Sequence, residues 1–535
     1  MTIMYFLPFI GLIIGELFLL RRTIHFFQLE SYQFQGYFRT LGRQLLAVFL
    51  PLLFYCSVAY MWVFAQTLLI KNIRISLIFQ VISSLFLCLL FASLGLLIAK
   101  IYYKRKEKKP FVKTTRIKRL YTAFILLSTV LHFLLFFLFP ITISLYGGLL
   151  LVLCLPLVLA VSALLALPVE KFIQYLYFKD AEKKIMQNER LVRLGITGSF
   201  GKTSTKFILN TLLSQRFNSL ATPASFNTPM GLTRIIRERL THAHQVFIGE
   251  MGARHVGEIK ELCQLVHPTI GILTSVAPQH LDTFGTIERI EKTKYELIDC
   301  LPDDGLAVFL HDDGRVTKLY EKTTKPKILV GKRGSDVYAE NIKVTPQGST
   351  FDLHIKGKAP VSVQTKLLGK HNISNILLAS AVADHLGMTT IEIARGIGAL
   401  EAVEHRMQIV STVGNITVID DAFNTNPISS KEALHILKSF EGRRIIVTPG
   451  MVELGAEEEK YNMEFGVNMA NSVDIAVLVG KKHCQPILKG LLQENFKEEQ
   501  IQVVDSLAEA IAFIKSVQQA GDVILYENDL PDNYL

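Results

Sequence analysis

A glycine-rich segment, Gly-Ser-Phe-Gly-Lys-Thr-Ser at residues 198–204, is the first part of the chain whose residue types suggest a definite chemistry. It follows an apolar run at 191–197 and precedes a helical apolar pattern, which is the order strand, loop, helix. Lys202 would reach the β- and γ-phosphates of a nucleotide, and Thr203 would bind Mg²⁺. Backbone N–H groups in such a loop suit phosphate oxygens. We expect this of Gly198, Ser199, Gly201 and Ser204. A strand–turn–helix with a glycine-rich bend and no ligand is the alternative.

Three more apolar runs end next to polar side chains. Ligands gather at the carboxyl ends of the strands in a parallel sheet. The run at 245–250 ends in Glu250, a carboxylate that could hold a hard cation. The run at 269–275 is followed by His280, although a single histidine is more often structural than a metal ligand. The run at 305–310 leads into His311, Asp312 and Asp313, which alone could be a polar turn.

The order of these runs predicts an α/β architecture after residue 191. Short apolar runs alternate with helical patterns, which is typical of βαβ units around a mainly parallel sheet. Residues 335–368 alternate apolar and polar around a Pro-Gln-Gly turn at 346–348, so we expect antiparallel strands there. A second α/β pattern begins after about residue 402. Its expected strands are 416–419, 444–447, 475–479, 501–504 and 523–526.

Residues 1–170 differ in composition from the rest of the 535-residue chain. They contain 16 Lys/Arg and 4 Asp/Glu, a net charge of +12, whereas residues 171–535 have a net charge of −2. The total of +10 therefore belongs to an apolar region and does not indicate nucleic-acid binding. Five runs here are long enough to span hydrocarbon. They lie at about 3–20, 44–70, 75–103, 121–139 and 142–168. Buried core helices are the alternative interpretation.

The basic loops predict how such spans are oriented. The loop after the first run carries four arginines, and the third loop carries nine Lys/Arg between residues 104 and 119. The positive-inside rule places both loops in the cytoplasm, so residues after 170 are expected to be cytosolic. We therefore predict a multi-pass plasma-membrane protein with cytoplasmic catalytic domains. Glu16, inside the first run, is expected near a helix end or facing other helices. A helical linker at 171–190 and domains at 191–402 and 403–535 complete the predicted organisation.

Several short motifs in the soluble part occur in an order known from one family. They are Thr-Gly-Ser-Phe-Gly-Lys-Thr at 197–203, Ser-Phe-Asn-Thr-Pro-Met-Gly at 225–231, Gly-Glu-Met-Gly-Ala at 249–253, Gly-Lys-His-Asn at 369–372, His-Arg at 405–406, Asp-Asp-Ala-Phe-Asn-Thr-Asn-Pro at 420–427 and Gly-Met-Val-Glu-Leu-Gly at 450–455. Through them, residues 191–535 resemble the Mur ligase family, most closely its members that add D-alanyl-D-alanine to a muramyl tripeptide. The resemblance implies a P-loop central ATP-binding domain and a Rossmann-like C-terminal domain.

The resemblance also implies roles for individual residues. Lys202, Glu250, His280 and Lys294 are the implied catalytic set, and ATP with two Mg²⁺ ions are the implied cofactors. Thr203, Glu250, His280 and Lys294 are the implied metal ligands, with Lys294 carbamylated. A solvated helix lysine is the alternative for Lys294, because charged residues surround it in the sequence.

Other residues are implied on the nucleotide and substrate side. Asn372, Asn375, Arg406 and Asp421 would contact ATP between the central and C-terminal domains. His311, Asp312 and Asn424 are weaker candidates for the nucleotide side. Asn227 falls where the family approaches substrate and phosphate.

The activity implied is ATP-dependent amide formation through an acyl phosphate. The implied partners are a small-molecule or lipid-linked envelope precursor, an amino acid or dipeptide amine, and the membrane, with no nucleic acid. The substrates stay open, because apolar runs replace the family's N-terminal sugar-nucleotide domain and residues 526–534 are acidic. A polyglutamate-type synthase is an alternative enzyme. A catalytically idle nucleotide-binding scaffold is an alternative of another class, and a transporter fits the pattern poorly.

Overall fold

The computed structural model describes residues 2–30, 32–72, 77–102, 110–224, 226–312, 314–411, 413–423, 425–481 and 483–528. Several residues of interest in the sequence lie outside these ranges. They are Arg74, the Lys/Arg residues at 104–109, Ser225, Asp313, Asn424 and the tail from residue 529. The chain separates into a helical unit, Met1–Gln174, and a larger unit, Tyr175–Leu530, which are described in turn.

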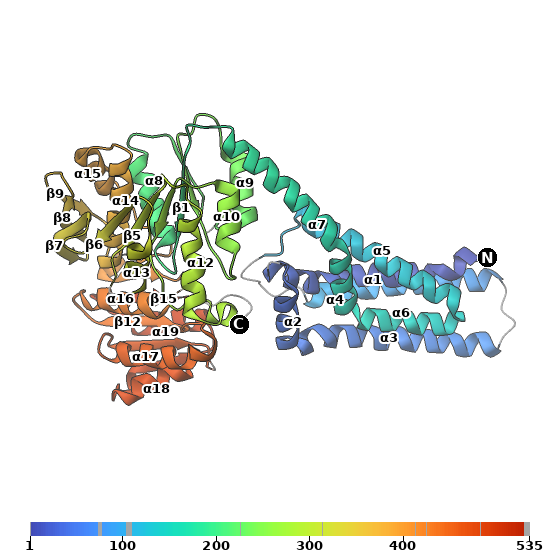
Figure 1. The fold of residues 1–535 in the computed structure, drawn as a ribbon. Helices are drawn as coiled ribbons and strands as arrows, with labels where there is room; N and C mark the ends of the chain where they lie inside the picture. The colour runs from blue at the N-terminus through green and yellow to red at the C-terminus, as the bar shows by residue number, and fades with distance from the viewer. Residues whose placement is uncertain are drawn as a thin grey trace. The chain divides into compact units, whose positions relative to one another are not determined.

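The helical unit is a bundle whose long helices run alongside one another (Figure 1). Its core is formed by apolar side chains from all of these helices. Helices α1 and α4 approach closely because Gly15 and Gly95 face each other, so that a Cβ on Gly95 would lie 2.6 Å from the Cα of Gly15. Small residues allow such contacts between apolar helices. The helices are α1 (Thr2–Leu29), α2 (Phe34–Arg43), α3 (Leu45–Asn72), α4 (Leu77–Tyr102), α5 (Thr115–Leu138), α6 (Ile141–Leu153) and α7 (Leu155–Met186).

Four helices of this unit are long and apolar enough to cross a membrane, counting only the described residues. They comprise Leu45–Ala65, Phe79–Tyr102, Thr115–Leu138 and Leu155–Met186. The first apolar run forms α1, which carries Glu16, Arg21 and Arg22 and is not one of the four. The sequence predicted five spans, and that number stays a prediction.

The fifth predicted span differs from the structure. The run at 142–168 does not form one helix, because α6 ends at Leu153 and α7 begins at Leu155. Pro156 follows this break, and proline has no N–H to continue a helix from the preceding turn. It is instead suited to the first turn of a new helix, which is where it lies in α7. Helix α7 then continues into the predicted linker at 171–190 and ends at Met186.

Glu16 is buried in the bundle and faces helix α5, as expected. Its side chain is 2% exposed, and the Ser128 hydroxyl donates a hydrogen bond of 2.5 Å to its Oε2 atom. The imidazole of His132, one turn further along α5, lies 3.7 Å from its Oε1 atom. A carboxyl group among apolar helices requires such partners.

The larger unit contains a nine-stranded sheet in which β1 is the third strand from one edge. Its order is β2-β3-β1-β4-β5-β6-β7-β8-β9, parallel as far as β7 and antiparallel beyond. The chain passes from β1 to β2 and β3 on one side and then to β4 on the other, so β1 lies at the switch point where ligands bind in such sheets. The strands are β1 (Val192–Thr197), β2 (Ser219–Ala221), β3 (Val246–Glu250), β4 (Ile270–Leu273), β5 (Leu306–Leu310), β6 (Lys327–Gly331), β7 (Val337–Thr345), β8 (Gly348–Ile355) and β9 (Val361–Thr365).

Helices cover both faces of this sheet (Figure 1). One apolar core joins the sheet to α8 (Lys202–Leu213), α14 (Lys370–His385) and α15 (Thr390–Gly398). The core on the opposite face includes the end of α7 and four helices. These are α9 (Pro229–Arg239), α10 (Glu258–Val266), α12 (Ile287–Asp299) and α13 (Arg315–Lys322), and a short α11 (Leu281–Phe284) precedes α12. The glycine-rich loop leads from the end of β1 in the sheet to α8 in the first of these helical layers.

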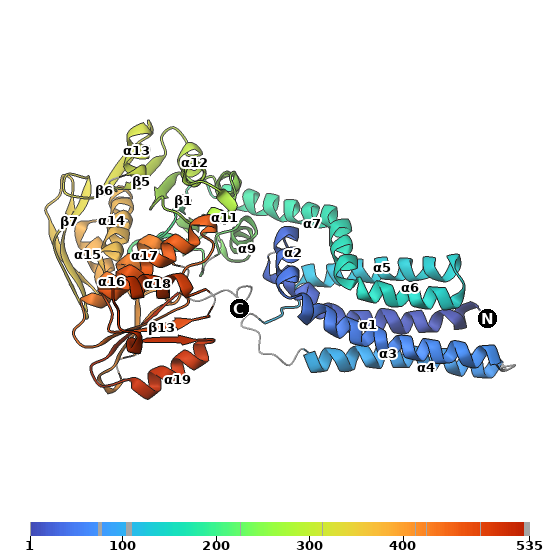
Figure 2. The same ribbon diagram turned by 90° about the horizontal axis from the view of Figure 1, so that it is seen from below.

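A second sheet of six strands follows, in the order β10-β11-β15-β12-β13-β14. Only β10 is antiparallel to its neighbour. Helices α16 (Pro427–Lys438), α17 (Glu458–Ala470) and α18 (Gln485–Gln493) cover one face, and α19 (Leu507–Val517) covers the other (Figure 2). The strands are β10 (Gln408–Ser411), β11 (Thr417–Asp421), β12 (Arg444–Thr448), β13 (Ile475–Val479), β14 (Ile501–Val504) and β15 (Val523–Glu527). The two α/β sheets after an apolar helical region confirm the predicted fold class.

Candidate active site

The glycine-rich loop lies between the carboxyl end of β1 and the first turn of α8. Gly198 has a φ of 153°, and a Cβ at this position would collide with the hydroxyl of Thr274. Gly201 has a φ of 80°, a left-handed conformation that costs glycine little, and it immediately precedes α8. The amide of Ser199 donates to the Ser275 carbonyl at 3.0 Å, which fixes the loop against the end of β4. The leading N–H groups of α8 lie at the end of this loop, and helix N-termini favour anions. The predicted phosphate contacts of the loop stay a prediction.

Lys202, the first residue of α8, folds its ammonium group over this loop. Its Nζ donates hydrogen bonds of 2.6 Å to the Gly198 carbonyl and 3.2 Å to the Ser199 carbonyl. Burial lowers the pKa of Lys202 to about 8, although the carboxylate of Glu250 acts in the opposite direction. The side chain therefore stays mainly protonated at pH 7. It is a desolvated cation at the position where the phosphates of a nucleotide are expected.

Glu250, at the carboxyl end of β3, accepts hydrogen bonds from three side chains. The Thr203 hydroxyl and the Asn227 amide each donate to Oε1 at 3.1 Å. The Lys206 ammonium donates to Oε2 at 2.9 Å. Burial alone would raise the pKa of Glu250, but the charges of Lys206 and Lys202 outweigh it, and the net pKa is lowered. The carboxylate is therefore ionised.

Lys206 is a site residue that the sequence analysis missed. It is fully buried, and its ammonium also donates to the Ala224 carbonyl. The available signal was its spacing, because residues four apart share one face of a helix and Lys206 follows Lys202 by four. A lysine on the buried face of α8 requires an anionic partner, and Glu250 provides it.

Thr203 and Glu250 together fit a hard cation. A hydroxyl oxygen and a carboxylate oxygen, 3.1 Å apart at the end of the loop, are donors of the type that Mg²⁺ prefers. In the parts of the chain that the structure describes, no three His, Cys, Asp or Glu side chains come together as a metal site. The larger predicted ligand set, with His280 and Lys294, stays a prediction.

His280 contacts a glutamate of the domain that contains the six-stranded sheet. Its Nδ1 atom lies 2.5 Å from Oε2 of Glu453, and Arg254 donates to the other oxygen of Glu453 at 3.2 Å. Burial lowers the pKa of His280, and Glu453 opposes part of this effect. Glu453 belongs to the motif at 450–455. The sequence analysis identified this motif but not its contact with His280. The pair connects the predicted metal-ligand segment to the C-terminal α/β layer.

Lys294 is buried within α12, with 2% of its side chain exposed. The alternative of a solvated helix lysine is therefore wrong. Burial lowers the pKa of Lys294 well below its ordinary value, and the charge of Lys202 lowers it further. Lys294 therefore lies close enough to Lys202 and Glu250 for their charges to act on it.

Of the predicted nucleotide residues from later in the chain, Asn375 contacts α8 and Arg406 acts electrostatically on Lys202. Asn375 in α14 accepts a hydrogen bond of 3.1 Å from the Thr205 hydroxyl in α8. The charge of Arg406 influences Lys202 and Glu250, which places this guanidinium near the loop. Burial raises the pKa of Asp421 to about 6, while Arg406 lowers it. Asn372 donates to the Leu368 carbonyl at 2.9 Å and lies beside Asn375.

His311 and Asp312 have local partners instead. His311 lies 3.3 Å from the Ser335 hydroxyl. The Asp312 carboxylate accepts hydrogen bonds from the amides of Gly314, Val316 and Thr317, which is the capping of helix α13. Their predicted nucleotide contacts, like that of Asn424 outside the described residues, stay predictions.

Replacing Lys206 with methionine is expected to destabilise the larger unit by about 3–5 kcal/mol, because it leaves the buried Glu250 carboxylate without its cation. The measurement is thermal unfolding of the full-length protein in detergent, followed by circular dichroism. Lys318→Met on the exposed surface of α13 is the matched control and should change stability by less than about 0.5 kcal/mol. Equal effects of the two substitutions would contradict the buried ion pair.

Family models and known relatives match the part of the chain that contains this candidate site. The family model described as Mur ligase middle domain matches residues 196–383, and that described as Mur ligase, glutamate ligase domain, matches residues 405–526. The chain is 32% identical over 293 residues to UDP-N-acetylmuramoyl-tripeptide--D-alanyl-D-alanine ligase of Escherichia coli K12, covering 54% of this chain and 64% of the relative. The enzyme of that name from Mycobacterium bovis is 31% identical over 359 residues, covering 63% of this chain and 70% of the relative.

Solved structures agree with the observed fold. The crystal structure of MurF from Acinetobacter baumannii superposes with a TM-score of 0.61 at 26% identity, covering 66% of this chain and 77% of that chain. MurF ligase from Thermotoga maritima, in complex with ADP, gives a TM-score of 0.61 at 25% identity, covering 66% of this chain and 80% of that chain. The family matches fall within the larger unit that carries the loop, Glu250 and Arg406. The chain therefore belongs to the Mur ligase family of ATP-dependent ligases.

Proposed function

We propose that this chain uses ATP to join a carboxyl group of a cell-wall precursor to the amine of D-alanyl-D-alanine or a similar amine. The observation that carries the proposal is the convergence of Lys202, Thr203 and Glu250 at the end of β1 and β3, with Arg406 within electrostatic reach. The names of the relatives from Escherichia coli and Mycobacterium bovis supply the substrates proposed.

The reaction would proceed in two balanced steps. A carboxylate oxygen attacks the γ-phosphorus of ATP and ADP leaves, which gives an acyl phosphate. The amine nitrogen then attacks the carbonyl carbon, phosphate leaves, and the nitrogen loses a proton. Lys202 and the loop amides would stabilise the charge that accumulates on the phosphate oxygens. Thr203 and Glu250 would hold Mg²⁺, which when bound supplies further charge neutralisation.

Lys294 would contribute a carboxylate of its own. Burial lowers the pKa of Lys294, which favours the neutral amine over the ammonium ion, and a neutral amine can add to CO₂ to form a carbamate with loss of a proton. The new negative charge would lie near Lys202, whose positive charge favours it. We propose this carbamate as the second metal-binding group, together with His280.

The helical unit would place this chemistry at a membrane. Four of its helices are long and apolar enough to span hydrocarbon. The basic loops favour a cytoplasmic location for the larger unit, where ATP is available. A precursor linked to a membrane lipid is therefore proposed as the acceptor, in preference to a soluble one.

The test is product formation by the full-length protein in detergent with ATP, Mg²⁺ and D-alanyl-D-alanine. Soluble UDP-N-acetylmuramoyl-tripeptide and its lipid-linked counterpart are supplied separately, and phosphate release and product mass are measured. We expect one phosphate per adduct and a higher kcat/KM for the lipid-linked acceptor. Equal kcat/KM for the two acceptors would contradict the role of the membrane, and ATP hydrolysis without an adduct would contradict the ligase.

A further inference from the structure

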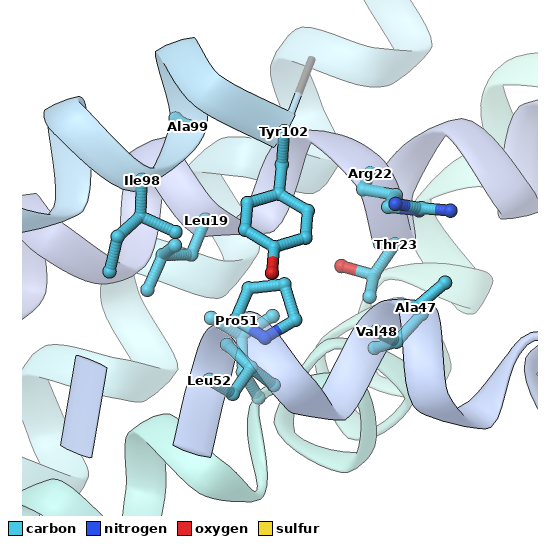
Figure 3. A pocket seen from close by; sticks show the side chains of 11 residues that line it. Leu19, Arg22, Thr23, Ala47, Val48, Pro51, Leu52, Ile98, Ala99 and Tyr102 are labelled. Atoms are coloured by element: carbon cyan, nitrogen blue, oxygen red, sulfur yellow. The ribbon is translucent and has the colours of Figure 1, made fainter. Parts of the chain in front are cut away.

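The cleft between α1, α3 and α4 of the helical unit is closed by its own side chains. The ring of Tyr102 extends across it toward Pro51, and Leu19 and Val48 line it as well (Figure 3). The cavity volume is about 20 Å³, which is room for about one water molecule. The cleft therefore has no room for a larger ligand, and the buried charges around Glu250, in the larger unit, are better placed to bind one.

The two oxygens of the Glu250 carboxylate have different partners. Thr203, the residue proposed to share Mg²⁺ with Glu250, donates a hydrogen bond of 3.1 Å to Oε1. Lys206 donates to Oε2 at 2.9 Å, and its side chain is fully buried. A buried ammonium group therefore occupies one oxygen of the same carboxylate that is proposed to bind the metal ion.

Lys206 is held in this position by further contacts. Its Nζ atom also donates a hydrogen bond to the Ala224 carbonyl and lies 4.7 Å from the centre of the Phe207 ring. A buried ion that loses its partner is strongly destabilising, because neither water nor another charge replaces that partner. Lys206 and Glu250 therefore stay paired in the protein without a ligand.

The charges around Glu250 do not favour a divalent cation on its own. The carboxylate supplies one negative charge, whereas Lys206 and Lys202 supply two positive charges that act on it. Arg406 acts on both lysines as well, and Asp421 offsets its charge. Solvent screens charges little in a buried site, so these interactions are strong. A cation added alone meets a net positive charge here, and the phosphates of a nucleotide would reverse it.

We propose that Lys206 makes the binding of Mg²⁺ at Thr203 and Glu250 depend on a bound nucleotide. Without a nucleotide, the Lys206 ammonium is the counter-charge of Glu250. With a nucleotide, the phosphates add negative charge beside Lys202, and the same carboxylate can then hold a divalent cation. Lys206 is a positioning residue, because it acts through Glu250. Its role rests on the proposed Mg²⁺ site and does not depend on which amine the enzyme joins.

The test measures Mn²⁺ binding to the full-length protein in detergent, by electron paramagnetic resonance. Mn²⁺ is a probe that accepts the same oxygen ligands as Mg²⁺. Lys206→Gln removes the charge but can still donate a hydrogen bond to Glu250. Without nucleotide, we expect this variant to bind Mn²⁺ at least about tenfold more tightly than the wild type. ADP should tighten Mn²⁺ binding by the wild type at least about tenfold, measured against a blank of ADP without protein.

Two variants test whether charge is the cause and Glu250 the place. Lys206→Arg keeps the charge, so without nucleotide it should bind Mn²⁺ no more tightly than the wild type. Lys206→Gln combined with Glu250→Gln lacks the carboxylate and should lose the gained affinity. The proposed carbamate on Lys294 is common to all of these proteins, so the differences among them do not depend on it.

Thermal unfolding gives a second measurement that does not require turnover. Mn²⁺ without nucleotide should raise the unfolding temperature of Lys206→Gln and leave that of the wild type unchanged, because a ligand stabilises the state that binds it. No stabilisation of Lys206→Gln by Mn²⁺, or an equal gain of affinity in Lys206→Arg, would overturn the proposal. Wild-type protein that binds Mn²⁺ equally with and without ADP would overturn it too. ADP-dependent Mn²⁺ binding without product formation would instead contradict the proposed ligase function alone.

Discussion

Lys202→Met should reduce phosphate release and product formation by about 10²–10³-fold, because it removes the preorganised cation nearest to the expected phosphates. The Lys202 ammonium is held over the loop by the Gly198 and Ser199 carbonyls, so it needs little rearrangement to meet a phosphate. The measurement is steady-state phosphate release by the full-length protein with both substrates present. Lys318→Met, on the surface of α13, is the control and should retain full activity.

The same variant separates an enzyme from an idle scaffold. A scaffold needs nucleotide binding at most, and its interactions would survive a change that affects only the transferred phosphate. Wild-type turnover that survives in Lys202→Met would contradict the catalytic role of the loop. Loss of turnover together with unfolding would be detected by circular dichroism, and Lys202→Arg, which keeps the charge, should then fold and retain partial activity.

Lys294→Ala should lower activity by about 10²-fold, and added short carboxylates such as formate should restore part of it. The expected loss follows from removing the proposed carbamate, which stands beside the phosphate site and offers negative oxygen donors. The rescue follows because a free carboxylate can supply the same donor atoms. The measurement is phosphate release with increasing formate at fixed ionic strength.

Lys292→Ala is the matched control for this prediction. Lys292 lies two residues earlier on α12 and is exposed, whereas Lys294 is buried. Its loss should leave activity unchanged and insensitive to formate. Activity of Lys294→Ala that equals the wild type would contradict the carbamate proposal, and a loss that formate does not restore would assign Lys294 to packing alone.

The sequence predicted the regular elements of the fold well where hydrophobic patterns are strong. The strands at Val192–Thr197 and Val246–Glu250 are interior strands of the sheet, and both were expected from continuous apolar runs. The three-residue strand Ser219–Ala221 and the edge strand Gln408–Ser411 were not expected, because short or edge strands carry little periodicity. The division at Cys154 was also missed, since the apolar run continues through it.

The sequence predicted which residues belong to the candidate site, but not which of their side chains contact one another. Motif order indicated Glu250 and His280 from their positions after strands. The pairing of Glu250 with Lys206, and that of His280 with Glu453, join segments 44 and 173 residues apart. Such contacts depend on tertiary packing, which hydrophobic periodicity does not encode.

The central claim is that a substrate carboxylate takes up the γ-phosphate of ATP, and oxygen transfer tests it most directly. The acceptor carboxyl group is labelled with ¹⁸O, and the phosphate released by the full-length protein is analysed by mass spectrometry. Attack by that carboxylate predicts one ¹⁸O atom in each phosphate, because the acyl phosphate loses its bridging oxygen to phosphate when the amine attacks. Phosphate without the label would mean that water attacks ATP, and it would contradict the ligase mechanism.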